Sequence, residues 1–363
     1  MALDDLVGLV RPGIRTISAY HPVVRSGGVV LDANEHPHGI PVEVRRGLAA
    51  ELAAADLHRY PDATELHEFL ARDHGLERDA VVLGNGSDEL ISLLCATFAH
   101  PRDGASVGKV LFPVPSFSVY TIAAKSAGVD VCAVPLSSDF TLDMDAMNSR
   151  IEAEEPNVVF LARPNNPTGT FWPEEQLLEM LKKFPGVLFV SDEAYGAYGA
   201  PSSLEKLSQF PNLLILRTLS KIGLAALRVG YLCGDPFLCR EVNKVRGPYN
   251  IGSLNLRAAM YMLKNHRDWT GERCSQVVQA REKLAAELQA LDGVEVFPSA
   301  ANFLLVRLAG GDERTSLVYQ RLVDDKIWVR RFTNDPVLAD CLRITVGTPE
   351  ENSAFFSAFQ KNL

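Results

Sequence analysis

A lysine that follows an apolar run is the residue of this sequence best suited to covalent chemistry. Lys221 stands in the stretch "RTLSKIGLAALRVGY", shortly after the apolar run "NLLIL". Two hydroxyl residues precede it, Thr218 and Ser220, and Arg228 follows it. Hydroxyls and a guanidinium group can together bind a dianionic phosphate, and a lysine amine can hold an aldehyde cofactor as a Schiff base. Because an isolated lysine is usually a solvated surface charge, the prediction depends on these neighbours.

Three further polar clusters follow apolar runs in the same way. "GNGSDEL" places Ser87 and Asp88 at the start of a predicted helix, where free N–H groups and the positive end of the helix dipole suit a phosphate. "RPNNPTG" follows "VVFLA" and offers the amide of Asn166. "SDEAY" follows "GVLFV" and puts Asp192 and Tyr195 at the end of a strand. Each cluster alone also fits an ordinary cap or turn, so only their combination indicates one site.

The elements that must position these groups alternate along the chain. From about residue 45 onward, short runs such as "KVLFPVP" and "NVVFLARP" alternate with helical patterns such as "WPEEQLLEMLKKF". Most of the runs are apolar throughout, which is typical of strands covered on both faces. The pattern predicts an α/β fold with a largely parallel, doubly wound sheet, whose ligand chemistry lies in the loops at the carboxyl ends of the strands.

The pattern changes after about residue 255. A long helical tract around "SQVVQAREKLAAELQAL" leads into the short strands "NFLLVRL", "IWVRRF" and "CLRITVG". We therefore predict three parts: an N-terminal segment, residues 1–45, that packs on the small domain, a large domain, residues 46–255, and a smaller α+β domain, residues 256–363.

Composition limits the class of protein. With 363 residues, 47% of them hydrophobic, the chain is long for a single core. The net charge of −9 argues against nucleic-acid binding. No apolar stretch approaches the roughly 18 residues of a membrane span, so we expect a soluble protein with no membrane partner, in the cytoplasm by default. The six cysteines are scattered, which favours core positions over a metal site or disulfides.

The order of the motifs resembles the fold-type I, class I/II aminotransferases that depend on pyridoxal 5'-phosphate (PLP). "NPTG", "SDEAY", "TLSK" and "LRVGY" occur in that order. More narrowly, "LDANEHPHG", "RYPD", "GNGSDELI", "SKIGLAALR" and "CLRITVGT" resemble the histidinol-phosphate aminotransferases. This resemblance implies a large domain with a mostly parallel seven-stranded sheet between helices. Two departures are His36 and His38, where relatives often have Asn or Tyr, and the compact loop from Lys221 to Arg228. The role of the two histidines stays open.

The resemblance also implies how the ring of PLP is held. Lys221 would bind the cofactor aldehyde and move the proton of the reaction. Asp192 would pair with the pyridine nitrogen and keep it protonated. Asn166 and Tyr195 would hydrogen-bond the phenolic oxygen of the ring. Phe117, in "VPSFSVY", would stack on the ring, although it also fits a core position.

For the cofactor phosphate, the resemblance implies a set of N–H, hydroxyl and guanidinium donors. In the family a tyrosine of the other subunit joins this set, and "RYPD" offers a candidate for it. The active site would then be shared, so a homodimer is expected. The set is Ser87 and Asp88 through their backbone, Thr218, Ser220 and Arg228 through their side chains, and Tyr60 from the second subunit.

Two anion sites are implied for the substrates. Arg343, in "CLRITVG", matches an arginine that clamps the α-carboxylate of glutamate and 2-oxoglutarate. Histidinol phosphate lacks that carboxylate, so its phosphate needs a second site. Arg330 and Tyr20 match positions that line the phosphate end, and Asn34, in "LDANE", is expected to bind substrate beside them. Arg331 is expected to be a solvated charge, and no metal is expected.

The function that this resemblance favours is a ping-pong transaminase of histidine biosynthesis. It would convert L-histidinol phosphate and 2-oxoglutarate to imidazole-acetol phosphate and L-glutamate. An aromatic amino-acid aminotransferase would keep the same ring-binding residues and stays open, since fold and cofactor do not determine the substrate. A threonine-phosphate decarboxylase fits the motifs less well. A non-catalytic PLP-fold regulator and an NAD-dependent dehydrogenase are remote, since neither a DNA-binding segment before residue 20 nor a GxGxxG motif is present.

Overall fold

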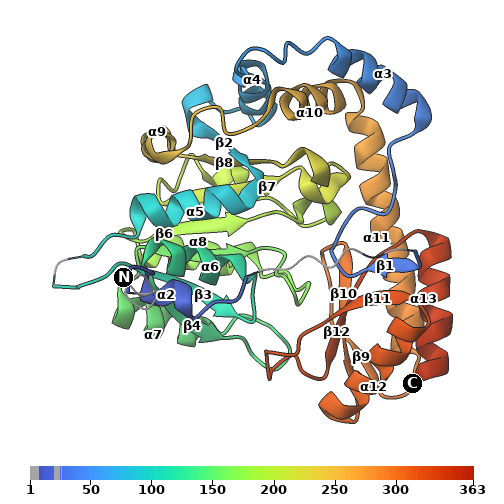
Figure 1. Ribbon diagram of the computed structural model, residues 1–363. Coiled ribbons are helices and arrows are strands. Elements are labelled where there is room, and N and C mark those ends of the chain that lie inside the picture. The colour runs from blue at the N-terminus through green and yellow to red at the C-terminus, as the bar shows by residue number, and fades with distance from the viewer. Residues whose placement is uncertain (1–7, 20–24, 26, 103) are drawn as a thin grey trace.

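Two β-sheets organise the protein, whose structure is a computed structural model (Figure 1). The structure describes residues 8–19, 25, 27–102 and 104–363. Figure 1 shows the larger sheet with its helices on one side of the molecule and the smaller sheet beside it. Both sheets contribute residues to the candidate site.

The larger sheet has seven strands, in the order β2-β8-β7-β6-β5-β3-β4. β8 runs antiparallel to both of its neighbours, and every other pair in the sheet is parallel. The predicted mostly parallel seven-stranded sheet is therefore confirmed. The strands are β2 (Val81–Asn85), β3 (Lys109–Val114), β4 (Asp130–Pro135), β5 (Val158–Ala162), β6 (Leu188–Asp192), β7 (Leu213–Thr218) and β8 (Val229–Gly234).

Helices cover both faces of this sheet, which is why its strands are apolar throughout. All five residues of β5 are buried, although successive side chains of a strand point to opposite faces. Val159 and Leu161 join the core on one face, and Val158 and Phe160 join the core on the other. The helices on the first face are α4 (Thr64–Asp73), α7 (Met144–Glu154), α8 (Glu174–Lys183) and α10 (Ser253–Asn265), and those on the second are α5 (Gly86–Phe98), α6 (Val119–Ala127) and α9 (Pro236–Val245).

The smaller sheet has five strands, in the order β1-β11-β12-β10-β9. β1 (Val29–Leu31) pairs in parallel with β11 (Ile327–Arg331), so the N-terminal segment enters this sheet. The other pairs are antiparallel. The remaining strands are β9 (Val294–Val296), β10 (Phe303–Leu308) and β12 (Cys341–Thr345), and the helices are α11 (Arg267–Gln289), α12 (Gly311–Asp324) and α13 (Pro349–Asn362).

The boundary between the two parts stays a prediction. Residue 255 falls inside α10, and Leu256 and Met262 of that helix belong to the core of the larger sheet. The remaining helical elements are α2 (Pro12–Arg15), α3 (Val42–Ala53), η1 (Arg78–Ala80), η2 (Gly196–Tyr198), η3 (Leu204–Lys206), η4 (Ser220–Ile222) and η5 (Ala225–Leu227).

Two of the compositional expectations can be compared with the structure. All six cysteines are buried with free thiols, in agreement with core positions. Among the described residues, no helix combines the length and the apolar character needed to cross a bilayer.

Candidate active site

The polar clusters of the sequence meet at one edge of the larger sheet. Asp192 is the last residue of β6 and Thr218 is the last residue of β7. These two strands are parallel neighbours, so their carboxyl ends lie at the same edge. α5 begins at Gly86, directly after β2, and adds a helix N-terminus to this edge. The segment η4, which contains Lys221, follows β7 there.

Asp192 is a buried carboxylate that accepts two hydrogen bonds. Its side chain is only 4% exposed. The Tyr120 hydroxyl donates to Oδ2 at 2.7 Å, and the Ala194 N–H donates to Oδ1 at 3.1 Å. Burial raises the pKa of Asp192 to about 6, although both hydrogen bonds act in the opposite direction. Among the described residues, no basic side chain forms an ion pair with Asp192. Its carboxylate could therefore bind a cationic group of a ligand.

Tyr195 lies near Lys221 and is held from the N-terminal segment. Asn34 Nδ2 donates to the Tyr195 hydroxyl at 2.9 Å, and Thr345 donates its hydroxyl to Asn34 Oδ1 at 3.1 Å. The Nζ of Lys221 lies 5.7 Å from the centre of the Tyr195 ring. The structure therefore places Asn34 against Tyr195, a contact that the sequence did not predict, and the substrate role of Asn34 stays a prediction.

Thr218, Ser220 and Arg228 surround the start of α5 with hydrogen-bond donors, a cluster called the phosphate cup. Arg228 Nη1 donates to Ser220 Oγ at 3.2 Å, and Thr218 Oγ1 donates to the same oxygen at 3.0 Å. Arg228 Nη2 also pairs with Asp88 Oδ2 at 3.1 Å. Only the backbone of Asp88 was predicted to take part, so its carboxylate is an addition to the site. Hydroxyls, guanidinium and helix N-terminus together suit a dianionic phosphate.

Two glycines keep this cup open. A Cβ at Gly86 would lie 2.5 Å from Arg228 Nη2, and Gly86 has the positive φ of +75° that side chains disfavour. A Cβ at Gly230 would lie 2.5 Å from the backbone nitrogen of Ser87. Larger residues at either position would displace a predicted phosphate donor.

Phe117 and Tyr120 bring aromatic rings to the same edge. Phe117 is half-buried, and its ring packs edge-on against Tyr120, with 5.7 Å between centres and 89° between planes. Tyr120 was missed by the sequence analysis. Its position three residues after Phe117 in "VPSFSVY", at the start of α6, is a signal that could have identified it.

Arg343 joins the two sheets at the site. It is buried on β12, and its Nη1 donates to Asn166 Oδ1 at 2.6 Å. Its Nη2 donates to the Asp32 carbonyl at 2.8 Å. Asn166 follows β5 of the larger sheet, so one guanidinium connects the strands of both sheets with the N-terminal segment. The amide oxygen of Asn166 is thus engaged, which leaves its NH₂ group for the proposed contact with the ring oxygen.

Arg330 lies on the same face as Arg343. The two residues are directly opposite in the antiparallel pair β11·β12, and residues in that relation point to one side of a sheet. Both guanidinium carbons lie 6.0 Å from the centre of the Phe332 ring, another residue that the sequence analysis missed. Arg330 is exposed. Arg331 pairs with Asp312 at 2.5 Å and is only 16% exposed, so it is a paired rather than a solvated charge.

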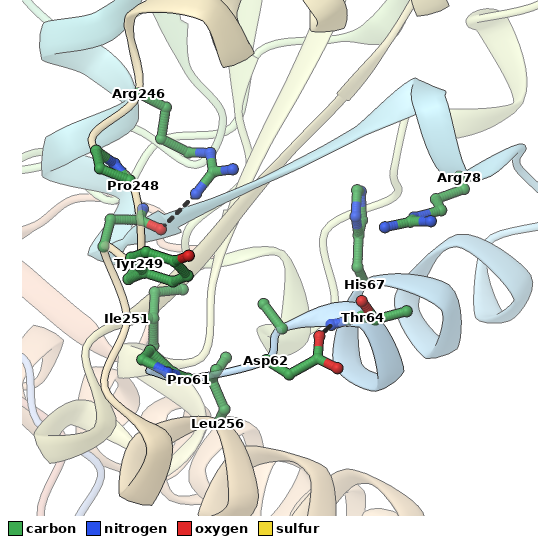
Figure 2. Close-up of a pocket in the computed structure, with 12 residues that line it drawn as sticks. Pro61, Asp62, Thr64, His67, Arg78, Arg246, Pro248, Tyr249, Ile251 and Leu256 are labelled. Carbon is green, nitrogen blue, oxygen red and sulfur yellow. Dashed lines mark hydrogen bonds between the residues drawn. The ribbon is translucent and has the colours of Figure 1, made fainter. Parts of the chain in front are cut away.

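Tyr60 lies on the surface. It is 78% exposed and stacks on Tyr249, with 4.4 Å between ring centres and 11° between planes. Figure 2 shows Tyr249 at a pocket of about 350 Å³, into which His67, Arg78 and Arg246 also point. None of the predicted cofactor residues, Tyr60 included, lines that pocket. The remaining predicted substrate residue, Tyr20, lies outside the described residues.

The two unassigned histidines lie beside the lysine segment. His36 Nδ1 accepts a hydrogen bond from the His38 N–H at 3.3 Å, and its ring contacts the position where Gly223 would carry a Cβ. Burial, with His38 nearby, lowers the pKa of His36 to about 4, so its ring is neutral at pH 7. Its Nε2 is buried without a partner among the described residues.

Comparison with known proteins shows the family to which this chain belongs. A model of the aminotransferases of class I and II matches residues 26–359. The chain belongs to this family. A histidinol-phosphate aminotransferase of Chromobacterium violaceum is 42% identical over 357 residues, which is 97% of each chain. Histidinol-phosphate aminotransferase 2 of Cupriavidus pinatubonensis is 40% identical over 366 residues, covering 98% of this chain and 96% of that protein.

Solved structures share the fold of this aminotransferase. A histidinol-phosphate aminotransferase of Sinorhizobium meliloti, in complex with PLP, has a TM-score of 0.85 at 24% identity and covers 97% of both chains. An L-threonine-O-3-phosphate decarboxylase of Porphyromonas gingivalis has a TM-score of 0.77 at 23% identity, covering 92% of this chain and 98% of that one. The fold therefore serves different reactions.

Proposed function

We propose that this aminotransferase transfers the amino group of L-histidinol phosphate to 2-oxoglutarate, giving imidazole-acetol phosphate and L-glutamate. The observation that carries the proposal is the placement of Arg330 and Arg343 opposite each other on one face of the smaller sheet. An ordinary amino acid needs one guanidinium for its α-carboxylate, whereas a substrate with a phosphate end needs a second anion site. Relatives about 40% identical over nearly the full length carry the name of this activity, which supports the same choice.

The residues at the edge of the larger sheet fit PLP. Asp192, buried and without a basic partner among the described residues, suits a protonated pyridine nitrogen. The hydroxyls and guanidinium around the start of α5 suit its phosphate. Bound PLP supplies an aldehyde for the amino group and a ring that withdraws electrons from the reacting carbon. Tyr195 and Asn166 would hold the ring oxygen, and Phe117 would pack on the ring.

Lys221 and the arginines divide the remaining work. Lys221 Nζ would hold the aldehyde until the substrate amine replaces it, and as a free amine it would then take the proton from the substrate carbon that bears the amine. Arg343 orients the carboxylate of glutamate and 2-oxoglutarate through two parallel donors. Arg330, with Tyr20, binds the phosphate of histidinol phosphate, and Asn34 fixes the position of Tyr195 at 2.9 Å.

We also propose a homodimer in which Tyr60 of the partner subunit completes the phosphate cup. Tyr60 stacks on Tyr249, and both rings are exposed, as are the apolar side chains of Leu57 and Leu254, close to them in sequence. Exposed apolar surface is usually covered by another chain. We further propose the division into segments 1–45, 46–255 and 256–363 and a cytoplasmic location.

Mixed subunits test the shared site. Chains with Lys221→Ala and chains with Tyr60→Ala are each expected to have little activity. A mixed dimer would contain one complete site, formed by Lys221 of one chain and Tyr60 of the other, so refolding the two variants together should restore activity. Light scattering gives the oligomeric state of each sample. A monomer, or an equal mixture without restored activity, would contradict the proposal.

The substrate is tested one half-reaction at a time. Purified enzyme loaded with PLP is mixed separately with histidinol phosphate, glutamate, phenylalanine and tyrosine, and the loss of the bound cofactor's visible absorbance is followed. Histidinol phosphate and glutamate are expected to react fastest. A faster reaction with phenylalanine or tyrosine would indicate an aromatic aminotransferase, and release of carbon dioxide from threonine phosphate would indicate a decarboxylase.

A further inference from the structure

Tyr120 is a buried titratable residue to which neither the proposed reaction nor the motifs give a role. Its side chain is 0% exposed, at the start of α6. The ring stacks on Phe160 of β5, with 4.8 Å between centres and 12° between planes, and lies 5.5 Å from Phe112 of β3. These contacts fix the ring on two sides, so its hydroxyl has little freedom to move.

Within the described part of the chain, the hydroxyl of Tyr120 has one hydrogen-bond partner, the Oδ2 of Asp192 at 2.7 Å. A phenylalanine would fill the same apolar space without the cost of burying a hydroxyl. The hydroxyl is therefore explained by Asp192 rather than by the core. Phe117, which would pack on the cofactor ring, lies edge-on against the same tyrosine. One side chain thus contacts both the proposed ring-nitrogen partner and the proposed stacking residue.

The direction of this hydrogen bond follows from the charges around it. Burial and the neighbouring carboxylate raise the pKa of Tyr120 well above its ordinary value, so the phenol keeps its proton and donates it. The bond lowers the pKa of Asp192 against burial, as the Ala194 N–H also does, whereas Asp88 and Glu193 raise it. A carboxylate can accept further hydrogen bonds beyond these two, so both oxygens keep capacity for a cation.

We propose that Tyr120 is a positioning residue for Asp192, which fixes one carboxylate oxygen and keeps the group ionised toward the ring nitrogen of the cofactor. The inference rests on the proposed function for the identity of that cation. The contact between Tyr120 and Asp192 itself is a property of the chain without cofactor. It can therefore be tested in both forms of the protein.

The first experiment uses the cofactor-free protein. Infrared titration of carboxyl groups, with Asp192→Asn subtracted to assign the signal, gives the pKa of Asp192. Tyr120→Phe is expected to raise this pKa by roughly one unit, because a hydrogen bond to a charged group is lost. Tyr231→Phe is the matched control, since its buried hydroxyl contacts His74 Nε2 at 3.0 Å outside the site. The control should leave the pKa of Asp192 unchanged.

The second experiment uses the enzyme loaded with PLP. Tyr120→Phe is expected to shift the pH midpoint of the bound cofactor's visible absorbance and to lower kcat about 10-fold, with the KM of both substrates nearly unchanged. Site-specific 3-fluorotyrosine at position 120 keeps the shape of the ring and donates more strongly. Its pH midpoint should move in the opposite direction. A merely structural tyrosine would give neither shift.

The outcomes separate this inference from the proposed function. Equal behaviour of Tyr120→Phe and Tyr231→Phe in both experiments would overturn the positioning role. If Tyr120→Phe does not fold, the protein with 3-fluorotyrosine at position 120 serves as the test. An unchanged pH midpoint of the cofactor absorbance in that protein would also overturn the positioning role. If the wild-type chain fails to bind PLP but Tyr120→Phe raises the pKa of Asp192, the proposed function fails and the contact stands.

Discussion

The cofactor half and the substrate half of the site are built in different ways. Asp192, Thr218 and Ser220 lie on or directly after neighbouring strands of one sheet and are buried with partners close in the structure. The substrate half forms where β11, β12 and the N-terminal segment meet, and its Arg330 is exposed. The comparison teaches that one sheet edge prepares the cofactor site, whereas the substrate site depends on how separate segments come together.

Electrostatics separates the two halves as well. Burial raises the pKa of Asp192, and a cation bound next to the carboxylate would lower that pKa again. Arg343 is buried too, but its Nη1 and Nη2 already donate to Asn166 Oδ1 at 2.6 Å and to the Asp32 carbonyl at 2.8 Å. A substrate carboxylate must therefore compete with these contacts or share the guanidinium with them. Binding in the substrate half is expected to be more sensitive to small rearrangements than binding in the cofactor half.

The largest effect is expected in the cofactor half, at Lys221. Lys221→Ala should lower turnover by roughly four orders of magnitude, because both the covalent link and the proton transfer are lost. Steady-state rates with histidinol phosphate and 2-oxoglutarate measure it. Lys283→Ala, which removes a side chain that is 78% exposed, is the control and should be fully active. Near-normal turnover of the Lys221 variant would show that the cofactor half does not use this lysine.

Asp192 should have the next largest effect. Asp192→Asn is expected to lower kcat by about two to three orders of magnitude, since the charge that stabilises a protonated ring is lost. Single-turnover rates with saturating PLP separate this loss from weaker cofactor binding. A fully active variant would show that another group protonates the ring.

Arg330 tests the substrate half alone. Arg330→Ala should raise the KM for histidinol phosphate about 10- to 100-fold, as expected for lost charged hydrogen bonds, and leave the KM for glutamate nearly unchanged. Arg331→Ala is the matched control, because Arg331 pairs with Asp312 on the other face of the strand. Equal losses for both substrates would argue against a separate phosphate site.

Tyr60 tests the contribution of a second chain to the cofactor half. Tyr60→Phe keeps the ring stacked on Tyr249 and removes only the hydroxyl. The dissociation constant for PLP should rise about 5- to 10-fold, the usual effect of one hydrogen bond. Equilibrium binding to the cofactor-free dimer measures it. Unchanged affinity would confine the phosphate site to one chain.

The smallest effect is on stability without cofactor. The folded-state pKa of Asp192, about 6, exceeds its ordinary value of 3.8, so the folded chain holds this proton more tightly than the unfolded chain. The contribution of protonated Asp192 to the free energy of unfolding is complete below pH 3.8 and is lost as the pH rises through about 6. Relative to wild type, the cofactor-free Asp192→Asn variant should gain about 2 °C in Tm between pH 4 and pH 8. Asp79→Asn, an exposed control, should show no such gain.

Residues of the cofactor half could be proposed from sequence because each follows a strand. Asp192 and Thr218 end apolar runs, and parallel strands bring such ends to one edge. Tyr120 could not be assigned in the same way, since its bond to Asp192 spans 72 positions. The same holds for Arg343 and Asn166, which are 177 positions apart and belong to different sheets.

By itself the sequence determined the alternation of buried strands and helices, the mostly parallel sheet and the cluster of lysine, hydroxyls and arginine after β7. These features are local, because they follow from hydrophobic periodicity and from residue types at strand ends. Only the tertiary structure decided that Tyr120 donates to Asp192, that Asn34 contacts Tyr195 and that Arg331 turns away to Asp312. Hydrogen bonds between distant segments depend on how the sheets pack, and no local pattern encodes that packing.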